Sequence, residues 1–213
     1  MTEPIRLLVV DDQSMVRGAL AALLSLERDM EVVGQAGDGR QAVAQLAALA
    51  EQTGRRANPV DVVLMDVEMP GGDGISACAK LRAAHPRTRV LMLTTFGRPG
   101  YVQRSLDAGA TGFVVKDAPS EQLADAVRRV AAGLRVIDPT LAVETLSRGT
   151  CPLTEREQEV LRAVAEGGTI ADVAAALSLG QGTVRNHVSA AMLKTGARTR
   201  AEAAKIALEA GWL

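Results

Sequence analysis

The sequence predicts a doubly wound α/β domain with a five-stranded parallel sheet, followed by a small all-α domain of four helices. In the first two thirds of the chain, short β-branched runs alternate with longer helical patterns, as in a parallel sheet with crossover helices. From Leu153 onward only short helical patterns remain. The chain has 213 residues, of which 47% are apolar, so each of two domains can bury a core of its own.

Five short runs are the expected strands. Residues 7–10 and 62–65 are apolar without alternation, which is typical of central strands covered on both faces. The strands are expected at residues 5–10, 31–36, 60–65, 90–94 and 112–115. Apolar residues at three- and four-residue spacing predict crossover helices at residues 14–26, 39–50, 74–84, 100–108 and 120–132.

The alternation of strands and helices stops after Gly133. Asp138 followed by Pro139 predicts the start of a short linker helix that ends near Ser147. We therefore expect a first domain at residues 1–133, a linker at residues 134–150 and a second domain at residues 151–213.

Capping residues predict the helix boundaries of the second domain. Thr154 with Glu157 has the pattern of a capping box, and Thr169 is expected to start a second helix with Asp172 in its first turn. Gly196 is expected to end a third helix. A final helix is expected from about residue 199 to residue 210.

Composition argues against several classes of protein. The chain has one Trp, one Tyr and two Phe, too few for a protein that binds single strands by base stacking. Two cysteines are too few for a disulfide framework or a zinc cluster, and they fit a reducing cytosol. The N-terminus reaches acidic residues after a very short apolar run, and no later run is long enough to span a membrane. We therefore expect a cytoplasmic protein with no membrane partner.

The distribution of charge matters more for DNA binding than the net charge of -1. Between residues 180 and 205 a group of basic residues accompanies a single acid, Glu202. The basic residues are Arg185, Lys194, Arg198, Arg200 and Lys205. This local basic segment is compatible with a DNA-binding surface.

Three carboxylates follow two of the expected strands. Asp11 and Asp12 come after the first strand and Asp66 after the third, so they are expected at the edge of the sheet where ligands bind in this fold class. Two carboxylates about 4 Å apart repel each other by roughly 4 kcal/mol at an effective dielectric constant near 20, which favours a divalent cation between them. Oxygen ligands favour Mg²⁺. The alternative is that each Asp caps the helix that follows it.

Two further polar residues are expected at the same edge. Thr94 follows the fourth strand and Lys116 follows the fifth. A phosphoryl group on Asp66 would need these partners: Thr94 donates to one phosphoryl oxygen, Lys116 pairs with another, and the metal neutralises the charge.

Four motifs, VVDD, LMDVEMPGGDG, MLTTF and GFVVKDAP, occur in this order, and residues 5 to about 133 resemble the CheY-like receiver domain of response regulators. The resemblance implies that Asp66 is the phosphoacceptor of a sensor histidine kinase. It also implies a magnesium site, in which Asp12 is a direct ligand and Asp11 acts through water. Asp66 itself and the backbone carbonyl of Glu68 are the further implied ligands. The implied switch residues are Thr94, Phe113 and Lys116. In a departure from many receivers, Asp117 follows Lys116 in place of a proline, and residues 50–59 lengthen the loop before the third strand.

The third helix of the second domain has two distinct faces. Val184, Val188, Ala191 and Thr195 form one stripe that is expected to face the core. The opposite face has Arg185, Asn186 and Ser189, which are side chains of the kind that contact base edges in a major groove. A solvated polar face is the alternative interpretation.

The segment LTEREQEVLRAVAEGGTIADVAAALSLGQGTVRNHVSAAMLKTGARTRAEAA resembles the LuxR-type helix-turn-helix of the NarL/FixJ regulators. The resemblance implies a supporting helix at residues 170–177, a recognition helix at residues 182–195 and a dimerisation helix at residues 199–210. It implies DNA contacts by Arg185, Asn186 and Ser189 at bases, and by Thr183, His187, Lys194 and Arg198 near phosphates. His187 is equally well interpreted as a packing residue.

Three positions depart from the pattern of this helix-turn-helix family. Gly180 replaces the usual serine cap, which costs a few tenths of a kcal/mol. Leu193 is expected on the groove side, and Thr195 takes the place of a leucine. The runs FGRPGY and ALEAGWL resemble the desaturase-regulator branch of the family.

The whole chain thus resembles a two-component response regulator. Phosphorylation of Asp66 is expected to promote formation of a homodimer and binding to double-stranded promoter DNA. The first helix has a second apolar stripe, Met15, Ala19, Ala22 and Leu26, that could form the dimer interface, with the fourth helix as the alternative.

Two other functions are weighed against this one. A haloacid-dehalogenase-like phosphatase also uses an aspartyl phosphate, but it needs a second Asp two residues after the nucleophile, where this chain has Glu68. An enzyme is therefore not expected. A regulator that works without phosphorylation is disfavoured by the complete set of Asp11, Asp12, Asp66, Thr94 and Lys116.

Overall fold

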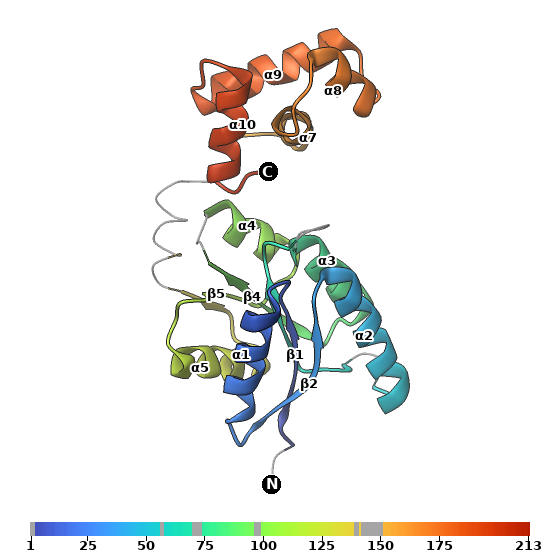
Figure 1. The fold of residues 1–213 in the computed structure, drawn as a ribbon, viewed down its shortest axis with the longest axis vertical. Helices are drawn as coiled ribbons and strands as arrows, with labels where there is room; N and C mark the ends of the chain where they lie inside the picture. The colour runs from blue at the N-terminus through green and yellow to red at the C-terminus, as the bar shows by residue number, and fades with distance from the viewer. Residues whose placement is uncertain (1–2, 56–57, 70–73, 96–98, 139–140, 142–150) are drawn as a thin grey trace. The chain divides into compact units, whose positions relative to one another are not determined.

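The structure, a computed structural model, describes residues 3–55, 58–69, 74–95, 99–138, 141 and 151–213. The chain divides into two compact units. The first contains a parallel sheet with helices on both faces, and the second contains only helices (Figure 1). The predicted fold class is confirmed for both. No helix in the described ranges is both long and apolar enough to cross a membrane.

The sheet of the first unit is entirely parallel, with the strand order β2-β1-β3-β4-β5-β6. Strands β1 to β5 begin and end within two residues of the predicted positions. Their bounds are Ile5–Val10 (β1), Met30–Ala36 (β2), Val62–Asp66 (β3), Arg89–Thr94 (β4) and Gly112–Val115 (β5). The order reverses between β1 and β3, the point at which ligands bind in such sheets.

The sheet has six strands, so the prediction of five is wrong in this detail. The sixth, β6 (Val136–Ile137), pairs in parallel with Gly112 and Phe113 of β5. Two residues are too short to show a periodic pattern, which explains why the sequence does not reveal this strand. The side chain of Val136 belongs to the apolar core beneath α5, so the sheet continues past Gly133.

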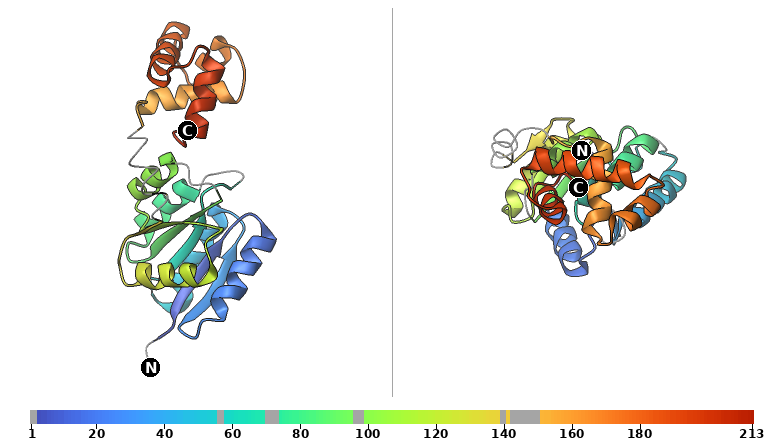
Figure 2. Two further views of the ribbon diagram at one scale, coloured as in Figure 1. Left: turned by 90° about the vertical axis from the view of Figure 1, so that its left-hand side faces the viewer. Right: turned by 90° about the horizontal axis from the view of Figure 1, so that it is seen from above.

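Five helices connect the strands of the first unit. α1 and α5 cover one face of the sheet, where Leu20, Leu24, Leu123 and Val127 pack on Leu64 and other strand residues in one buried cluster. α2 and α3 lie on the opposite face (Figures 1 and 2). The bounds are Ser14–Ser25 (α1), Gly39–Thr53 (α2), Gly74–Ala84 (α3), Pro99–Asp107 (α4) and Ser120–Ala131 (α5).

α2 extends three residues beyond its predicted end and stops at Gly54, whose φ of +69° is a left-handed conformation that favours glycine. Part of the lengthened segment at residues 50–59 is therefore helical. The predicted linker helix, from Asp138 to Ser147, lies mostly outside the described residues.

The second unit has the four predicted helices, α7 (Glu155–Ala165), α8 (Ile170–Ala176), α9 (Gln181–Thr195) and α10 (Arg200–Glu209). The capping boxes predicted at Thr154 and observed at Thr169 are both complete, each with reciprocal bonds to the residue three positions on. α9 begins after Gly180, which offers no side-chain cap, and ends at Gly196 with a φ of +69°. The predicted core stripe of α9 is buried at Val184, Val188 and Ala191.

Candidate functional site

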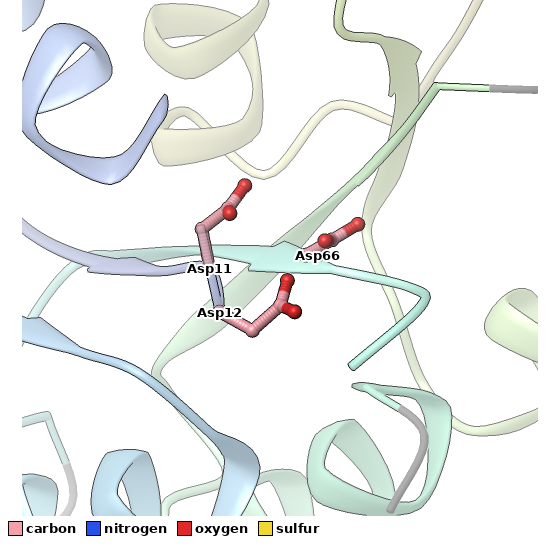
Figure 3. A group of neighbouring side chains, drawn as sticks. All are labelled: Asp11, Asp12 and Asp66. Atoms are coloured by element: carbon pink, nitrogen blue, oxygen red, sulfur yellow. The ribbon is translucent and has the colours of Figure 1, made fainter. Parts of the chain in front are cut away.

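Two neighbouring strands deliver three carboxylates to one edge of the sheet. Val10 at the end of β1 pairs with Met65 of β3, so the residues that follow them, Asp11 and Asp66, are side by side. Carboxylate oxygens of Asp11, Asp12 and Asp66 all lie within 4.8 Å of one another (Figure 3). Asp11 is completely buried and Asp66 is 3% exposed, whereas Asp12 is half-buried. The structure thus brings together the three carboxylates predicted from the sequence.

Neither Asp11 nor Asp12 is the N-cap of α1, so the capping interpretation is wrong for these two carboxylates. The N-cap of α1 is Gln13, and its side chain makes no cap bond. Asp11 instead accepts a hydrogen bond from the Gln13 backbone N–H at 2.9 Å. Among the described residues, α3 begins at Gly74, whose backbone N–H donates to the carbonyl of Val67 at 2.9 Å.

Gly74 allows the start of α3 to approach the end of β3 closely. A Cβ atom at this position would lie 1.8 Å from the backbone oxygen of Asp66, which no side chain could tolerate. The last glycine of the motif LMDVEMPGGDG, Gly74, is therefore required by the close packing of α3 against Asp66, the expected phosphoacceptor.

Lys116 lies between two of the carboxylates. Its Nζ is 2.6 Å from Oδ2 of Asp11 and 2.8 Å from Oδ2 of Asp66. The Lys116 side chain is only 11% exposed, and its backbone N–H donates to the carbonyl of Thr94 at 2.7 Å. The ends of β4 and β5 therefore hold the ammonium group over the acidic site, where it balances part of the negative charge.

Burial and neighbouring charges have opposite effects on the pKa values of Asp66 and Lys116. Burial raises the pKa of the Asp66 carboxyl above its ordinary value, although the hydrogen bond and charge of Lys116 act in the lowering direction. Burial lowers the pKa of the Lys116 ammonium, but its bonds to Asp11 and Asp66 outweigh this effect and the net pKa is raised. Lys116 thus keeps its positive charge at neutral pH and stabilises the ionised form of Asp66.

The donor set fits a hard divalent cation, because it consists of carboxylate oxygens from three residues. Glu68, whose backbone carbonyl is a further predicted ligand, has an exposed side chain. Its backbone N–H lies 3.4 Å from Oδ1 of Asp66, which keeps this loop next to the carboxylates.

The three predicted switch residues occupy β4, β5 and the residue after β5. Thr94 ends β4 and is 1% exposed, and Phe113 of β5 is completely buried opposite Met92. Thr94 and Lys116 lie at the carboxyl edge beside the acidic residues, whereas Phe113 lies two positions inside the sheet.

The polar face of α9 is open to solvent, as predicted. Thr183, Arg185, Asn186 and Ser189 are exposed, and the only partner of the Arg185 guanidinium within the described part of the chain is Gln181 at 3.4 Å. His187 is half-buried, as its packing interpretation requires. The exposed face therefore has one forked donor, Arg185, and three short polar side chains, which are groups of the kind that contact base edges.

Leu193 and Arg198 extend this exposed surface. Leu193, four residues after Ser189, is 85% exposed, in keeping with the expectation that it lies on the groove side. Arg198, in the turn after α9, has an exposed side chain.

Lys194 is engaged inside the second unit. Its Nζ lies 2.7 and 2.9 Å from the two carboxylate oxygens of Glu157, whose side chain is 6% exposed. Burial raises the pKa of Glu157, but the bonds from Lys194 and Thr154 outweigh it, and the net pKa is lowered. Sequence reasoning identified Glu157 only as part of a capping box, since nothing in the local pattern shows a partner 37 residues away.

Two family profiles match the chain. Residues 7–128 match the response regulator receiver domain, and residues 151–207 match the bacterial regulatory proteins of the luxR family. Each match covers the region that the sequence motifs indicated.

Curated relatives are similar to the chain over nearly its whole length. The transcriptional regulatory protein YvfU of Bacillus subtilis (strain 168) is 44% identical over 209 residues, which are 98% of this chain and 100% of the relative. The transcriptional regulatory protein DesR of the same organism is 42% identical over 98% of each chain. The response regulator RamR of Streptomyces coelicolor is 38% identical over 100% of each chain.

Solved structures of similar architecture include the response regulator ChrA of a heme-sensing two-component system. It is 31% identical, with a TM-score of 0.56 over 98% of each chain. The response regulator RcsB of Salmonella typhimurium gives a TM-score of 0.68 over 98% of this chain and 99% of its own, and at 23% identity this similarity concerns the fold alone.

Proposed function

Because the chain belongs to the NarL/FixJ-type two-component response regulators, with a receiver and a LuxR-type DNA-binding domain, we propose that a sensor histidine kinase phosphorylates Asp66 to control promoter binding. The observation that supports Asp66 best is its position beside Asp11, Asp12 and Lys116 at the switch point of the sheet. This family consists of transcriptional regulators, so the phosphatase alternative is wrong.

We propose that the carboxylates hold Mg²⁺, with Asp12 as a direct ligand and Asp11 acting through water. The Asp66 carboxylate and the Glu68 backbone carbonyl are the other two proposed protein ligands. When bound, the ion would neutralise charge on the phosphoryl oxygens.

The residues around Asp66 have separate roles in phosphoryl transfer. A carboxylate oxygen of Asp66 attacks the phosphorus while the bond to the donor breaks. Lys116 then exchanges its contact with Asp66 for a phosphoryl oxygen, and the Thr94 hydroxyl donates to another. Burial of Asp66 keeps water away from the reacting carboxylate.

We propose that Thr94 and Phe113 relay the modification to the receiver surface. The new bond to the phosphoryl oxygen would hold the Thr94 side chain in one arrangement and favour one packing of Phe113. A stripe on α1 is a candidate for the dimer contact that follows, because Met15 is 85% exposed and Leu26 is 79% exposed. α4 is the alternative surface.

In the DNA-binding domain, we propose that α9 enters the major groove of promoter DNA. Arg185, Asn186 and Ser189 are the proposed base contacts, and the proposed phosphate contacts are Thr183, His187, Lys194 and Arg198. Of these residues, Lys194 already pairs with Glu157, which neutralises its charge. A dimer places two such helices on two half-sites.

The division of the chain is likewise a proposal. We propose a receiver that extends past residue 133 to include β6, a linker up to residue 150 and a DNA-binding domain at residues 151–213. A partner such as promoter DNA implies that the protein acts in the cytoplasm.

Phosphorylation can be tested with acetyl phosphate and Mg²⁺ on the purified chain, followed by intact-protein mass measurement. The wild type should gain one phosphoryl group, and Asp66→Asn should gain none. Asp107→Asn, at an exposed carboxylate of α4, is the matched control and should react like the wild type. Equal modification of the wild type and Asp66→Asn would show that the phosphoacceptor is assigned wrongly.

A further inference from the structure

An open cavity of about 510 Å³ lies at the edge of the sheet opposite to the carboxylates. Its walls come from Asn58 before β3, from the end of α3 through the start of β4, from Thr111 just before β5 and from Gly133 after α5. These are the amino ends of the strands, whereas the acidic site lies at their carboxyl ends. The volume is within the range of about 300–1,000 Å³ that is usual for small-molecule sites.

Positive charge dominates this cavity. Arg82, Arg87 and Arg89 line it, and no acidic residue does. Within the described ranges, none of the three guanidinium groups pairs with a carboxylate, whereas Arg128 elsewhere in this unit pairs with both Glu27 and Asp29. Three unneutralised cations around a hollow attract anions.

Arg82 is held rigidly and still has unused donors. Its Nη1 donates to the backbone oxygens of Pro86 at 2.5 Å and Thr88 at 2.6 Å, which fixes the turn between α3 and β4. Its Nε is buried and has no hydrogen-bond partner among the described residues.

Arg89 is held in place from two sides. Its backbone N–H donates to the carbonyl of Asp61 at 3.0 Å as β4 begins. Its guanidinium lies against Gly133, where a Cβ atom would come within 3.0 Å of Nη2. The φ of +86° at Gly133 also favours glycine, so this turn leaves room for the arginine.

We propose that this cavity binds a small phosphate-bearing molecule with two or more negative charges. Guanidinium forks match phosphate oxygens in pairs, and three of them favour a diphosphate or triphosphate over a singly charged anion. The Thr111 hydroxyl adds a neutral donor at the wall. A concave site built from four separate segments suits a small ligand better than the backbone of a DNA duplex. The proposal does not depend on phosphorylation of Asp66.

The test is a titration of the full chain with sodium tripolyphosphate and, separately, with ATP, both without Mg²⁺ and at constant ionic strength. NMR signals of the arginine Nε–H groups report the site directly. Saturable shifts of the Arg82, Arg87 and Arg89 signals are expected. Arg87→Gln and Arg89→Gln should each weaken binding about tenfold or more, because each removes a charge-assisted pair of hydrogen bonds.

Two kinds of variant serve as controls. Arg40→Gln, at an exposed arginine of α2, should bind like the wild type. Arg87→Lys and Arg89→Lys keep the charge but lose the fork, so they should weaken binding less than the glutamine variants. Arg82 is left unchanged because it holds the turn.

Three outcomes would overturn the proposal. Shifts that never saturate would show that no site exists. An equal loss in Arg40→Gln would show general ionic attraction. Shifts of the three arginine signals with a DNA duplex but not with the phosphates would show that this edge is a contact for the DNA backbone.

Discussion

At the scale of the residue, Lys116 is the group on which the acidic site depends. Asp11 and Asp66 are both buried, and the ammonium of Lys116 is within 2.8 Å of each. The sequence predicted that Lys116 belongs to this edge, because it follows β5 as the acids follow β1 and β3. It did not predict the bridge to Asp11, which spans 105 residues of chain, because no local pattern encodes such a contact.

Replacing Lys116 should destabilise the receiver at neutral pH. Lys116→Met leaves two buried carboxylates without a counter-ion, and we expect a loss of about 2 kcal/mol in the free energy of unfolding. Lys116 acts to lower the pKa of Asp66, so its removal raises that pKa further; the loss is complete above the pKa of Asp66 in the variant and shrinks as the pH falls from there through the wild-type pKa.

Urea unfolding of the full chain at neutral and mildly acidic pH measures this dependence on pH. Lys80→Met, at an exposed lysine of α3, is the matched control and should leave the free energy of unfolding unchanged. A Lys116→Met loss that stays the same at both pH values would contradict the explanation.

Lys194 should contribute to stability more than to DNA affinity. Lys194→Ala leaves the buried Glu157 carboxylate without its main partner, and we expect the DNA-binding domain to lose about 1–2 kcal/mol. The pKa of Glu157 is lowered in the folded state, so this contribution is present above the unfolded-state pKa and is lost as the pH falls through the lowered value.

Thermal unfolding of the full chain tests the role of Lys194, with Arg198→Ala as the comparison because the Arg198 side chain is exposed. Arg198→Ala should weaken DNA binding without changing the transition of the DNA-binding domain. If instead Lys194→Ala left that transition unchanged and weakened all duplexes, Lys194 would be a phosphate contact only.

At the scale of the element, the sequence predicted helices better than it predicted strand number. The capping boxes at Thr154 and Thr169 depend on contacts between residues three positions apart, so the sequence itself contains the whole signal. β6 has only two residues, and its existence depends on β5 lying beside it. The polar face of α9 was likewise predicted from the helical periodicity of the sequence, and it is exposed in the structure.

The exposed face of α9 should determine which sequences are bound. Arg185→Ala and Asn186→Ala should each reduce the preference for a promoter duplex over a random duplex by about 1–3 kcal/mol, because they remove contacts to base edges. Arg198→Ala should weaken both duplexes alike. Fluorescence titrations with both duplexes measure the preference, and an unchanged ratio in Arg185→Ala would exclude base contact by that residue.

At the scale of the whole molecule, formation of a dimer is the proposed link between the acidic edge of one domain and the exposed helix α9 of the other. Moving an equilibrium from about 1:99 to 99:1 requires roughly 5.5 kcal/mol of differential stabilisation, which is more than a few contacts of Thr94 and Lys116 supply. We therefore expect a partial shift, with some dimer present before phosphorylation. Sequence motifs identified both domains, but nothing in them encodes the dimer surface.

The α1 stripe offers a direct test of that surface. Ala19→Asp places a charge among the exposed apolar residues of α1, and it should reduce dimer formation after phosphorylation at least tenfold, because burying the charge is unfavourable. Sedimentation measures the monomer and dimer fractions. Ala44→Asp, at an exposed position of α2, is the control. An Ala19→Asp chain that still dimerises fully would favour the α4 surface instead.

Coupling between the two domains is measured by the affinity of the full chain for its promoter duplex before and after treatment with acetyl phosphate and Mg²⁺. The duplex can be recovered by genome-wide chromatin immunoprecipitation. The wild type should bind about tenfold or more tightly after treatment, since coupling between sites is typically worth about 1–3 kcal/mol. Asp66→Asn should show no change. Equal tightening of both proteins, or no tightening of a wild type whose phosphorylation is verified by mass, would contradict the account.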